Sequence, residues 1–258
     1  MSVVLLGDRE VGKTSIVAAL AEYSLEKDSK VKIVSPEPKS LLADLRPETG
    51  KGAGTANKSE KELTIQVLRP TGALKQVNLV WIDLPGEFFQ EHSSRRENGG
   101  EDWREIQTRI EKSKYVILLI PPHRGMVTTA SLENTTEALR PEKVLPNEEQ
   151  WHKRLYAWFD FLNLHCSRAS RILICIHKAD LFCDLDRVSS DWAYVPGQIS
   201  TDFWRRYHEF SKSFLRSMRQ RVKAYSQTDA GTNTNFFITS IVHRELLALP
   251  WLYIGLYL

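Results

Sequence analysis

The feature that most constrains this chain is a glycine-rich loop near its start, set between a short apolar run and a helical segment. Residues 7–14 read GDREVGKT and fit the pattern G-x-x-x-x-G-K-[ST]. Residues 3–6 before the loop predict a strand, and residues 15–23 after it predict a helix. Because a strand, glycine loop and helix in this order turn backbone N–H groups toward an anion, the segment predicts a phosphate-binding loop.

The fixed positions of this loop have physical roles in holding phosphate. Glycine allows the turn that points N–H groups inward, and the helix N-terminus adds partial positive charge. Lys13 can reach the β- and γ-phosphates, which also makes it a candidate catalytic residue, and the Thr14 hydroxyl can ligate Mg²⁺. The residues expected to contact the nucleotide here are Gly7, Glu10, Val11, Gly12, Lys13, Thr14 and Ser15.

Short aliphatic and β-branched runs predict six strands. Several are apolar without alternation, as in strands covered on both faces, and helical patterns lie between most of them. This predicts an α/β fold with a doubly wound, mostly parallel six-stranded sheet and helices on both faces. The predicted strands span residues 3–6, 63–68, 77–82, 115–120, 172–176 and 236–239.

Two apolar stripes at helical spacing predict long buried helices. The first runs through residues 151–162, and the second through residues 203–225, where basic side chains fall largely on the other face. The length suits one domain over residues 1–258, with insertions around 36–61, 87–100, 121–147 and 181–200. Residues 245–258 are strongly apolar but contain Pro250 and Gly255, so they predict a poor helix that buries itself, with the C-terminal end truncated.

Charge and cysteine usage narrow the function classes. The chain has 35 basic and 32 acidic residues, a balance that predicts no nucleic-acid partner. Its three cysteines form no close-set metal pattern and no complete disulfide framework, which favours a reducing cytoplasm. No apolar run reaches the roughly 18 residues of a membrane-spanning helix, so we expect a soluble cytoplasmic protein.

Two further motifs follow predicted strands. Asp83-Leu-Pro-Gly86 fits D-x-x-G after the strand at 77–82, where Asp83 can hold Mg²⁺ through a water and Gly86 can donate its N–H to the γ-phosphate. His177-Lys178-Ala-Asp180 follows the strand at 172–176 and resembles the N-K-x-D guanine box of GTPases. The Asp180 carboxylate can accept hydrogen bonds from guanine N1–H and N2–H₂, whereas adenine offers a mismatched edge.

Thr239-Ser240 ends the last predicted strand, where GTPases carry their final base-contacting box. The order phosphate loop, D-x-x-G, K-x-D and T-S, each at a strand end, resembles the Ras-like P-loop GTPase superfamily. The resemblance implies GTP or GDP and Mg²⁺ as ligands, Ser240 among the base contacts, and a molecular switch that hydrolyses GTP. It also implies a switch threonine on Mg²⁺, for which Thr49 and Thr55 are available and Thr55 is preferred.

The resemblance further implies a protein effector or activating partner. The large insertions are similar to those of G modules in bacterial multidomain signalling or defence proteins. The phosphate loop departs from the family's usual small residues at Arg9 and Glu10, and the position of a water-orienting glutamine holds Glu87, with Gln90 nearby. These departures predict slow hydrolysis, for which Glu87 and Gln90 are the catalytic candidates beside Lys13.

Two other functions stay open on the sequence alone. The first is a GTP-binding regulatory scaffold without hydrolysis, suggested by the same departures. The second is a P-loop ATPase, which the acceptor geometry of Asp180 disfavours. His177 stands where the guanine box usually has asparagine, and a neutral imidazole donates only one hydrogen bond, so the sequence also predicts weakened nucleotide affinity.

Overall fold

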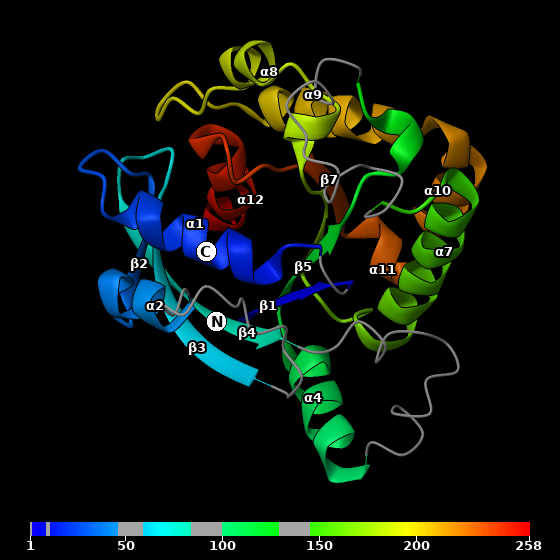
Figure 1. Ribbon diagram of the computed structural model, residues 1–258, viewed down its shortest axis with the longest axis horizontal. Helices are drawn as coiled ribbons and strands as arrows, with labels where there is room; N and C mark the ends of the chain where they lie inside the picture. The colour runs from blue at the N-terminus through cyan, green and yellow to red at the C-terminus, as the bar shows by residue number, and fades with distance from the viewer. Residues whose placement is uncertain (1, 9–10, 46–58, 84–99, 129–144) are drawn as a thin grey trace.

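The chain folds around one seven-stranded sheet, mostly parallel, with helices on both faces (Figure 1). The computed structural model describes residues 2–8, 11–45, 59–83, 100–128 and 145–258. The strand order is β2-β3-β4-β1-β5-β6-β7, and β3 runs antiparallel to the other six of these strands. The strands are β1 (Ser2–Gly7), β2 (Val31–Ser35), β3 (Ser59–Leu68), β4 (Leu74–Asp83), β5 (Tyr115–Ile120), β6 (Arg171–Ile176) and β7 (Thr234–Ile238).

The predicted fold class is confirmed, but the predicted number of strands is wrong by one. All six predicted strands are present, and β2 adds a seventh at the sheet edge. In β2, Val31 and Ile33 are buried whereas the charged Lys32 between them is partly exposed. A five-residue edge strand buried on one face offers too short an alternation to stand out in the sequence.

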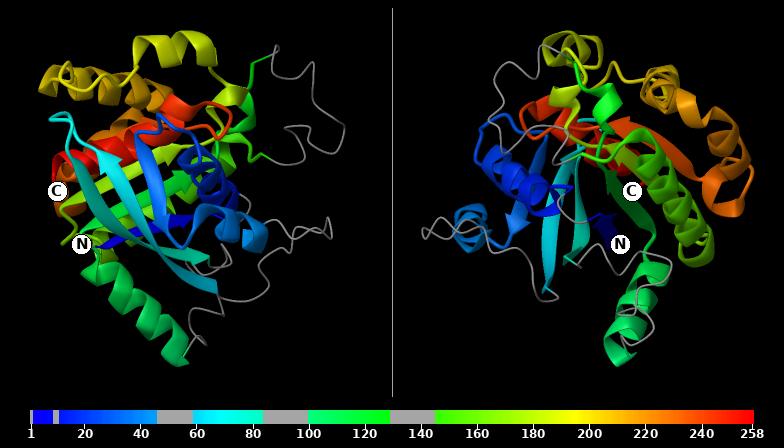
Figure 2. Two further views of the ribbon diagram at one scale, coloured as in Figure 1. Left: turned by 90° about the vertical axis from the view of Figure 1, so that its left-hand side faces the viewer. Right: turned by 45° about the vertical axis from the view of Figure 1, so that its right-hand side comes forward.

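Helices cover both faces of the sheet (Figure 2). Helices α1 and α12 lie together on one face, α4 and α7 lie on the other, and α9 packs beside the edge strand β7. The α-helices are α1 (Lys13–Ser24), α2 (Pro38–Leu45), α4 (Gly100–Lys112), α7 (Glu148–His165), α8 (Leu185–Asp191), α9 (Thr201–Lys212), α10 (Arg219–Tyr225), α11 (Asp229–Thr232) and α12 (Arg244–Leu256). Three short 3₁₀ segments also occur among the described residues: η2 (Arg124–Met126), η4 (Ala179–Leu181) and η5 (Ser213–Met218).

The first predicted helical stripe is confirmed in α7. Its predicted core residues are buried, and the helix begins with a capping box in which the Asn147 side chain accepts from the Gln150 N–H. The Gln150 side chain in turn accepts from the Asn147 N–H, so two N–H groups of the helix start are satisfied. The buried stripe comprises Trp151, Leu155, Trp158, Phe159 and Leu162.

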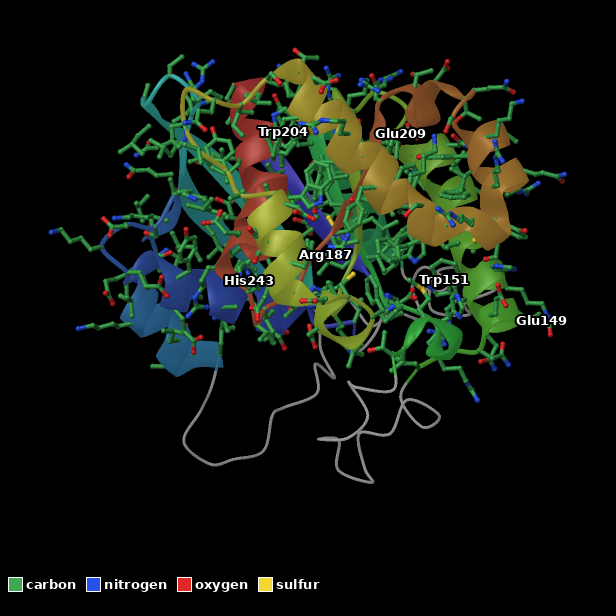
Figure 3. All side chains as sticks on the ribbon, turned by 90° about the horizontal axis from the view of Figure 1, so that it is seen from above. Glu149, Trp151, Arg187, Trp204, Glu209 and His243 are labelled. Atoms are coloured by element: carbon green, nitrogen blue, oxygen red, sulfur yellow. The ribbon has the colours of Figure 1, made fainter. Side chains whose placement is uncertain are left out.

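The second predicted helix is not continuous. It is divided into α9, η5 and α10, because the backbone at Leu215 (φ −99°, ψ 20°) leaves the α-helical path. Trp204 of α9, labelled in Figure 3, is buried, and its ring centroid lies 5.0 Å from that of Tyr253 on α12. The predicted stripe is confirmed in part. Its buried members are Tyr207, Met218, Val222 and Tyr225, its partly buried members are Phe203, Phe210 and Phe214, and the other buried residues of these segments are Trp204, Ser211 and Leu215.

The apolar C-terminal segment forms a regular helix, so the prediction of a poor helix was wrong, whereas its burial was predicted correctly. Residues 246–255 of α12 are all buried, which is typical of a helix enclosed on every side. Gly255 has a specific role there, because a Cβ at this position would lie 2.8 Å from Cγ1 of Val67 on β3. Among the described residues, no helix combines the length and apolar character needed to cross a lipid bilayer.

Candidate functional site

Five strands bring the predicted motifs to one edge of the sheet. β1, β4, β5, β6 and β7 run parallel, so their carboxyl ends lie on the same side. The register pairs Gly7 with Leu119, Leu119 with Cys175, and Cys175 with Phe237. The segments that follow these strands therefore start at equal height, at the edge where ligands bind in open α/β sheets.

The phosphate loop occupies the turn from β1 into α1. Gly7 approaches β5 so closely that a Cβ would lie 2.7 Å from the carbonyl oxygen of Leu119. Gly12, immediately before α1, has a left-handed backbone (φ 103°), and a Cβ there would also lie 3.1 Å from Nε2 of His177. Both glycines of the motif are thus required by the fold, one by a close approach and the other by its dihedral angle.

Lys13 is held within this loop although it carries a charge. The side chain is 5% exposed, and Nζ donates to the carbonyl oxygens of Gly7 at 2.9 Å and Asp8 at 3.0 Å. These bonds compensate for the burial of the ammonium group and fix its position over the loop. A positive charge is therefore preorganised where the sequence predicts the β- and γ-phosphates.

Other predicted phosphate and magnesium residues lie around this lysine. Val11 is buried, Thr14 is half-buried, and Ser15 is exposed at the start of α1. Asp83 is the last residue of β4, two positions beyond the pairing of Leu5 with Trp81, so its backbone ends near the height of Gly7. Several predicted residues lie outside the described part of the chain: Arg9, Glu10, Thr49, Thr55, Gly86, Glu87 and Gln90.

His177 connects the end of β6 to both neighbouring parts of the site. It is 1% exposed, and its Nδ1 lies 2.9 Å from Oγ1 of Thr239, with donor and acceptor set by the imidazole tautomer. The opposite side of the ring packs on Gly12. Burial, with a smaller effect of the Lys178 charge, lowers the pKa of His177 to about 3, so the ring is neutral at physiological pH. The imidazole thus joins the K-x-D turn, the T-S turn and the phosphate loop.

The K-x-D turn places Asp180 against the end of β7. Lys178 has a left-handed backbone (φ 61°, ψ 46°), which turns the chain from β6 into η4. Ser240, fully buried, then donates from Oγ to Oδ1 of Asp180 at 2.5 Å, and the same Oγ accepts from the N–H of Val242 at 3.1 Å. The Asp180 carboxylate is therefore oriented by a hydroxyl that is itself fixed by the backbone.

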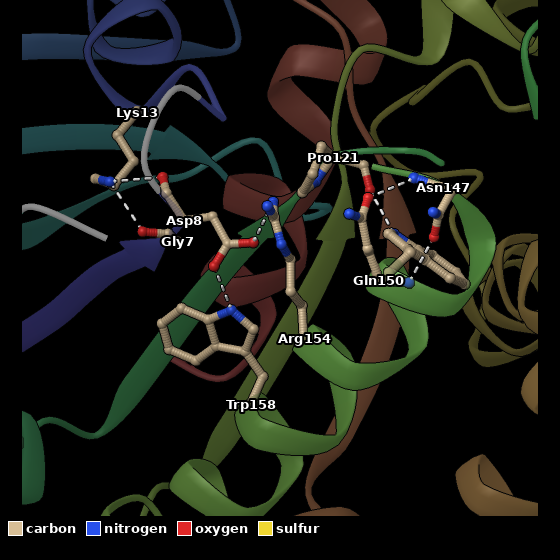
Figure 4. A network of polar contacts seen from close by, with 9 residues as sticks. Gly7, Asp8, Lys13, Pro121, Asn147, Gln150, Arg154 and Trp158 are labelled. Atoms are coloured by element: carbon tan, nitrogen blue, oxygen red, sulfur yellow. Dashed lines mark hydrogen bonds and ion pairs between the residues drawn. The ribbon is translucent and has the colours of Figure 1, made fainter. Parts of the chain in front are cut away.

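The structure also brings residues into the site that the sequence reasoning missed. The Asp8 carboxylate accepts from Nε1 of Trp158 at 2.9 Å, and its Oδ2 lies 3.8 Å from Arg154 (Figure 4). Both partners come from α7, about 150 positions later in the chain. No signal in the sequence indicated this contact, because Asp8 occupies a variable position of the phosphate-loop pattern and Trp158 fits equally well as a core residue.

A family model described as Double-GTPase 1 matches residues 4–170, more than half of the chain. The chain belongs to the Double-GTPase 1 family. The part matched by the Double-GTPase 1 model includes the phosphate loop, β4 and α7, and it ends just before β6. The K-x-D and T-S turns therefore lie beyond the matched residues, and their assignment depends on their geometry.

Similar solved structures include two GTPase-related proteins. One is translation elongation factor SelB from Methanococcus maripaludis in complex with the GTP analogue GPPNHP, at 11% identity and a TM-score of 0.39, covering 99% of this chain and 34% of that one. The other is the S. cerevisiae Ski7 GTPase-like domain bound to GTP, at 16% identity and a TM-score of 0.39, covering 94% and 43%. This Double-GTPase 1 chain thus spans less than half the length of either. Comparison with curated protein sequences finds no match.

Proposed function

We propose that this chain is a GTP-binding molecular switch that takes GTP or GDP with Mg²⁺ and hydrolyses GTP slowly. The observation that carries the proposal is the joining of two predicted subsites through one side chain. His177 lies beside Gly12 of the phosphate loop, where a Cβ would meet its Nε2 at 3.1 Å, and contacts Thr239 beside the base turn, while Ser240 orients Asp180. Membership of a GTPase family, which implies guanine nucleotide binding, supports the same function.

Guanine selectivity rests on Asp180 in this proposal. A carboxylate has about four lone-pair sites, so it can accept from Ser240 and from guanine N1–H and N2–H₂ together. Adenine has no donor at N1 and would leave the carboxylate facing an acceptor. Charge-assisted hydrogen bonds contribute about 1.5 to 3 kcal/mol each, so a preference for GTP over ATP of about a hundredfold is expected.

The magnesium ion would be held by oxygen ligands at the phosphate end. Thr14 is a half-buried hydroxyl residue on the first turn of α1, adjacent to the buried Lys13, and hard oxygen donors are the ligands that Mg²⁺ prefers. Asp83 ends β4 at the same sheet edge, and Thr55 remains the proposed switch ligand. When bound, Mg²⁺ neutralises phosphate charge and favours displacement at the γ-phosphate.

Hydrolysis is the slower part of the proposed activity. Lys13 supplies one preorganised positive charge for the phosphates. Glu87 and Gln90 are the candidates for positioning the attacking water. The position directly after D-x-x-G, where many GTPases have a glutamine, holds Glu87. A carboxylate at Glu87 beside the γ-phosphate is electrostatically unfavourable, so we propose that a protein partner supplies the missing group.

Binding and turnover are tested separately on the purified chain. Fluorescent GTP and ATP are titrated with and without Mg²⁺, and hydrolysis of bound GTP is then followed over a single turnover. The proposal expects magnesium-dependent binding of GTP, much weaker binding of ATP and slow release of phosphate. Equal affinity for ATP would refute the guanine assignment, and tight GTP binding without turnover would instead support a regulatory scaffold.

A further inference from the structure

The phosphate loop contains a carboxylate that points toward helix α7. The Asp8 side chain is only 16% exposed and lies against α7, where Trp158 donates to Oδ1 and Arg154 lies near Oδ2 (Figure 4). Burial raises the pKa of Asp8, while Trp158, Arg154 and Lys13 lower it. A negative charge at this position therefore depends on compensation from two helices, α1 and α7.

This charge is positioned to influence phosphate binding. The carbonyl oxygen of Asp8 accepts directly from Nζ of Lys13, so the carboxylate belongs to the residue that holds the phosphate-binding ammonium group. A negative charge in the loop repels the phosphates. It also partly cancels the electrostatic attraction between Lys13 and the phosphates. The strength of both effects depends on how fully Arg154 neutralises the carboxylate.

Arg154 differs from the rest of this cluster because it is accessible. Its side chain is 49% exposed on α7, whereas Asp8 and Trp158 are largely buried. The separation of 3.8 Å between Arg154 and Oδ2 of Asp8 is an ion pair without a short hydrogen bond, so the guanidinium can be withdrawn at low cost. The positive charge of Arg154 thus lies at the molecular surface, whereas the negative charge of Asp8 lies within the phosphate loop.

We propose that Asp8, Trp158 and Arg154 form a charge latch through which helix α7 sets the affinity of the phosphate loop for a nucleoside triphosphate. Trp158 holds the carboxylate in place by its indole N–H, and Arg154 offsets the carboxylate charge. Withdrawal of the guanidinium removes part of the compensation for the anion and weakens binding of the more highly charged nucleotide most. The latch rests on the proposed function, because it acts on nucleotide affinity.

A double-mutant cycle on the full chain tests the latch. Affinities for fluorescent GTP and GDP are measured at pH 7 for the unmodified chain, Asp8→Asn, Arg154→Met and the double variant. Arg154→Met should weaken GTP binding by roughly three- to tenfold, with a smaller effect on GDP. Asp8→Asn should bind GTP more tightly than the unmodified chain, since asparagine keeps an acceptor for Trp158 but removes the charge. When Asp8→Asn is already present, adding Arg154→Met should change affinity less than twofold.

Two further variants separate charge compensation from packing. Arg154→Lys keeps the charge and should bind GTP within about twofold of the unmodified chain. Lys153→Met removes an exposed cation one position earlier on α7, paired with Glu149, and should leave affinity unchanged. Urea unfolding of each variant identifies any that are simply destabilised.

The outcomes distinguish the latch from the proposed function. Absence of GTP binding by the unmodified chain would overturn both. If the unmodified chain binds GTP, the latch alone would be overturned by one result: Arg154→Met lowers affinity equally with and without Asp8→Asn. Arg154 would then act independently of the carboxylate. Weaker binding by a stably folded Asp8→Asn variant would also overturn it.

Discussion

The two ends of the candidate site are built by different means. At the phosphate end, Lys13 is fixed by backbone carbonyl oxygens and the turn depends on two glycines. At the base end, side chains hold one another, through the contacts His177–Thr239 and Ser240–Asp180. The phosphate end therefore depends on backbone geometry and on one ammonium group, whereas the base end depends on side chains that hold one another.

The side-chain contacts of the base end show how His177, the unusual residue of the predicted guanine box, fits into the fold. His177 provides a neutral ring that reaches Thr239 on one side and Gly12 on the other, so it links the two ends. The left-handed backbone at Lys178 adds local strain of about 1 to 3 kcal/mol, which the surrounding contacts offset. The base end is thus rigid through packing and hydrogen bonds.

Replacement of Lys13, the proposed phosphate-binding residue, should have the largest effect. Lys13→Ala removes the positive charge at the phosphate end, and we expect loss of more than a hundredfold in affinity for both GTP and GDP. Fluorescent nucleotide titration measures the change. Lys153→Ala, at an exposed lysine of α7, is the matched control and should retain full affinity. Unchanged binding by Lys13→Ala would remove the phosphate end from the site.

Replacement of Asp180, the proposed base-recognising residue, should affect only one nucleotide. Asp180→Ala should lower affinity for GTP by about a hundredfold and change ATP affinity only slightly, because only guanine donates to the carboxylate. Competition between the two nucleotides measures the ratio. Asp184→Ala is the matched control, since Asp184 caps α8 through the Arg187 N–H and should affect stability alone. An equal loss for both nucleotides would contradict the division into two ends.

The buried imidazole should make stability sensitive to acid. The pKa of His177 is about 3 in the folded chain against an ordinary value of 6.5, so only the unfolded chain takes up this proton as the pH falls below 6.5. This uptake should lower the free energy of unfolding by about 2 kcal/mol at pH 5 relative to neutral pH. His177→Asn should remove that part of the decline, as measured by urea unfolding at both pH values. Identical declines in the two proteins would show that His177 titrates normally.

Removal of the orienting hydroxyl should have the smallest effect. Ser240→Ala deletes the hydrogen bond to Asp180 but leaves the carboxylate in place, so we expect about a fivefold loss of GTP affinity. ATP affinity should not change. Ser226→Ala, which removes a hydroxyl bonded to the Val222 carbonyl at the end of α10, serves as control. A loss as large as that of Asp180→Ala would mean that orientation, rather than the carboxylate itself, governs base recognition.

The sequence predicted the fold class and the strand ends because both depend on local patterns. Unbroken apolar runs indicated the central strands, and the glycine loop indicated the turn into α1. The edge strand β2 was missed because its alternation spans only five residues. The break at Leu215 was missed because no glycine or proline marks it; tertiary packing there overrides helical periodicity.

Long-range partners within the site were beyond sequence reasoning. The bonds from Trp158 to Asp8 and from His177 to Thr239 join positions that are 150 and 62 residues apart, and no local spacing encodes them. The poor-helix prediction for residues 245–258 failed for a similar reason. Propensity penalises Pro250 and Gly255, whereas complete burial favours the helix that contains them.

The position of α12 has a consequence for the order in which the chain can fold during synthesis. This helix packs against α1, β2 and β3, which are made early, and against β6 and β7, which are made late. The phosphate loop therefore leaves the ribosome long before the helix that completes its supporting layer. Until about residue 256 has emerged, the apolar faces of these early elements need shielding from other nascent chains.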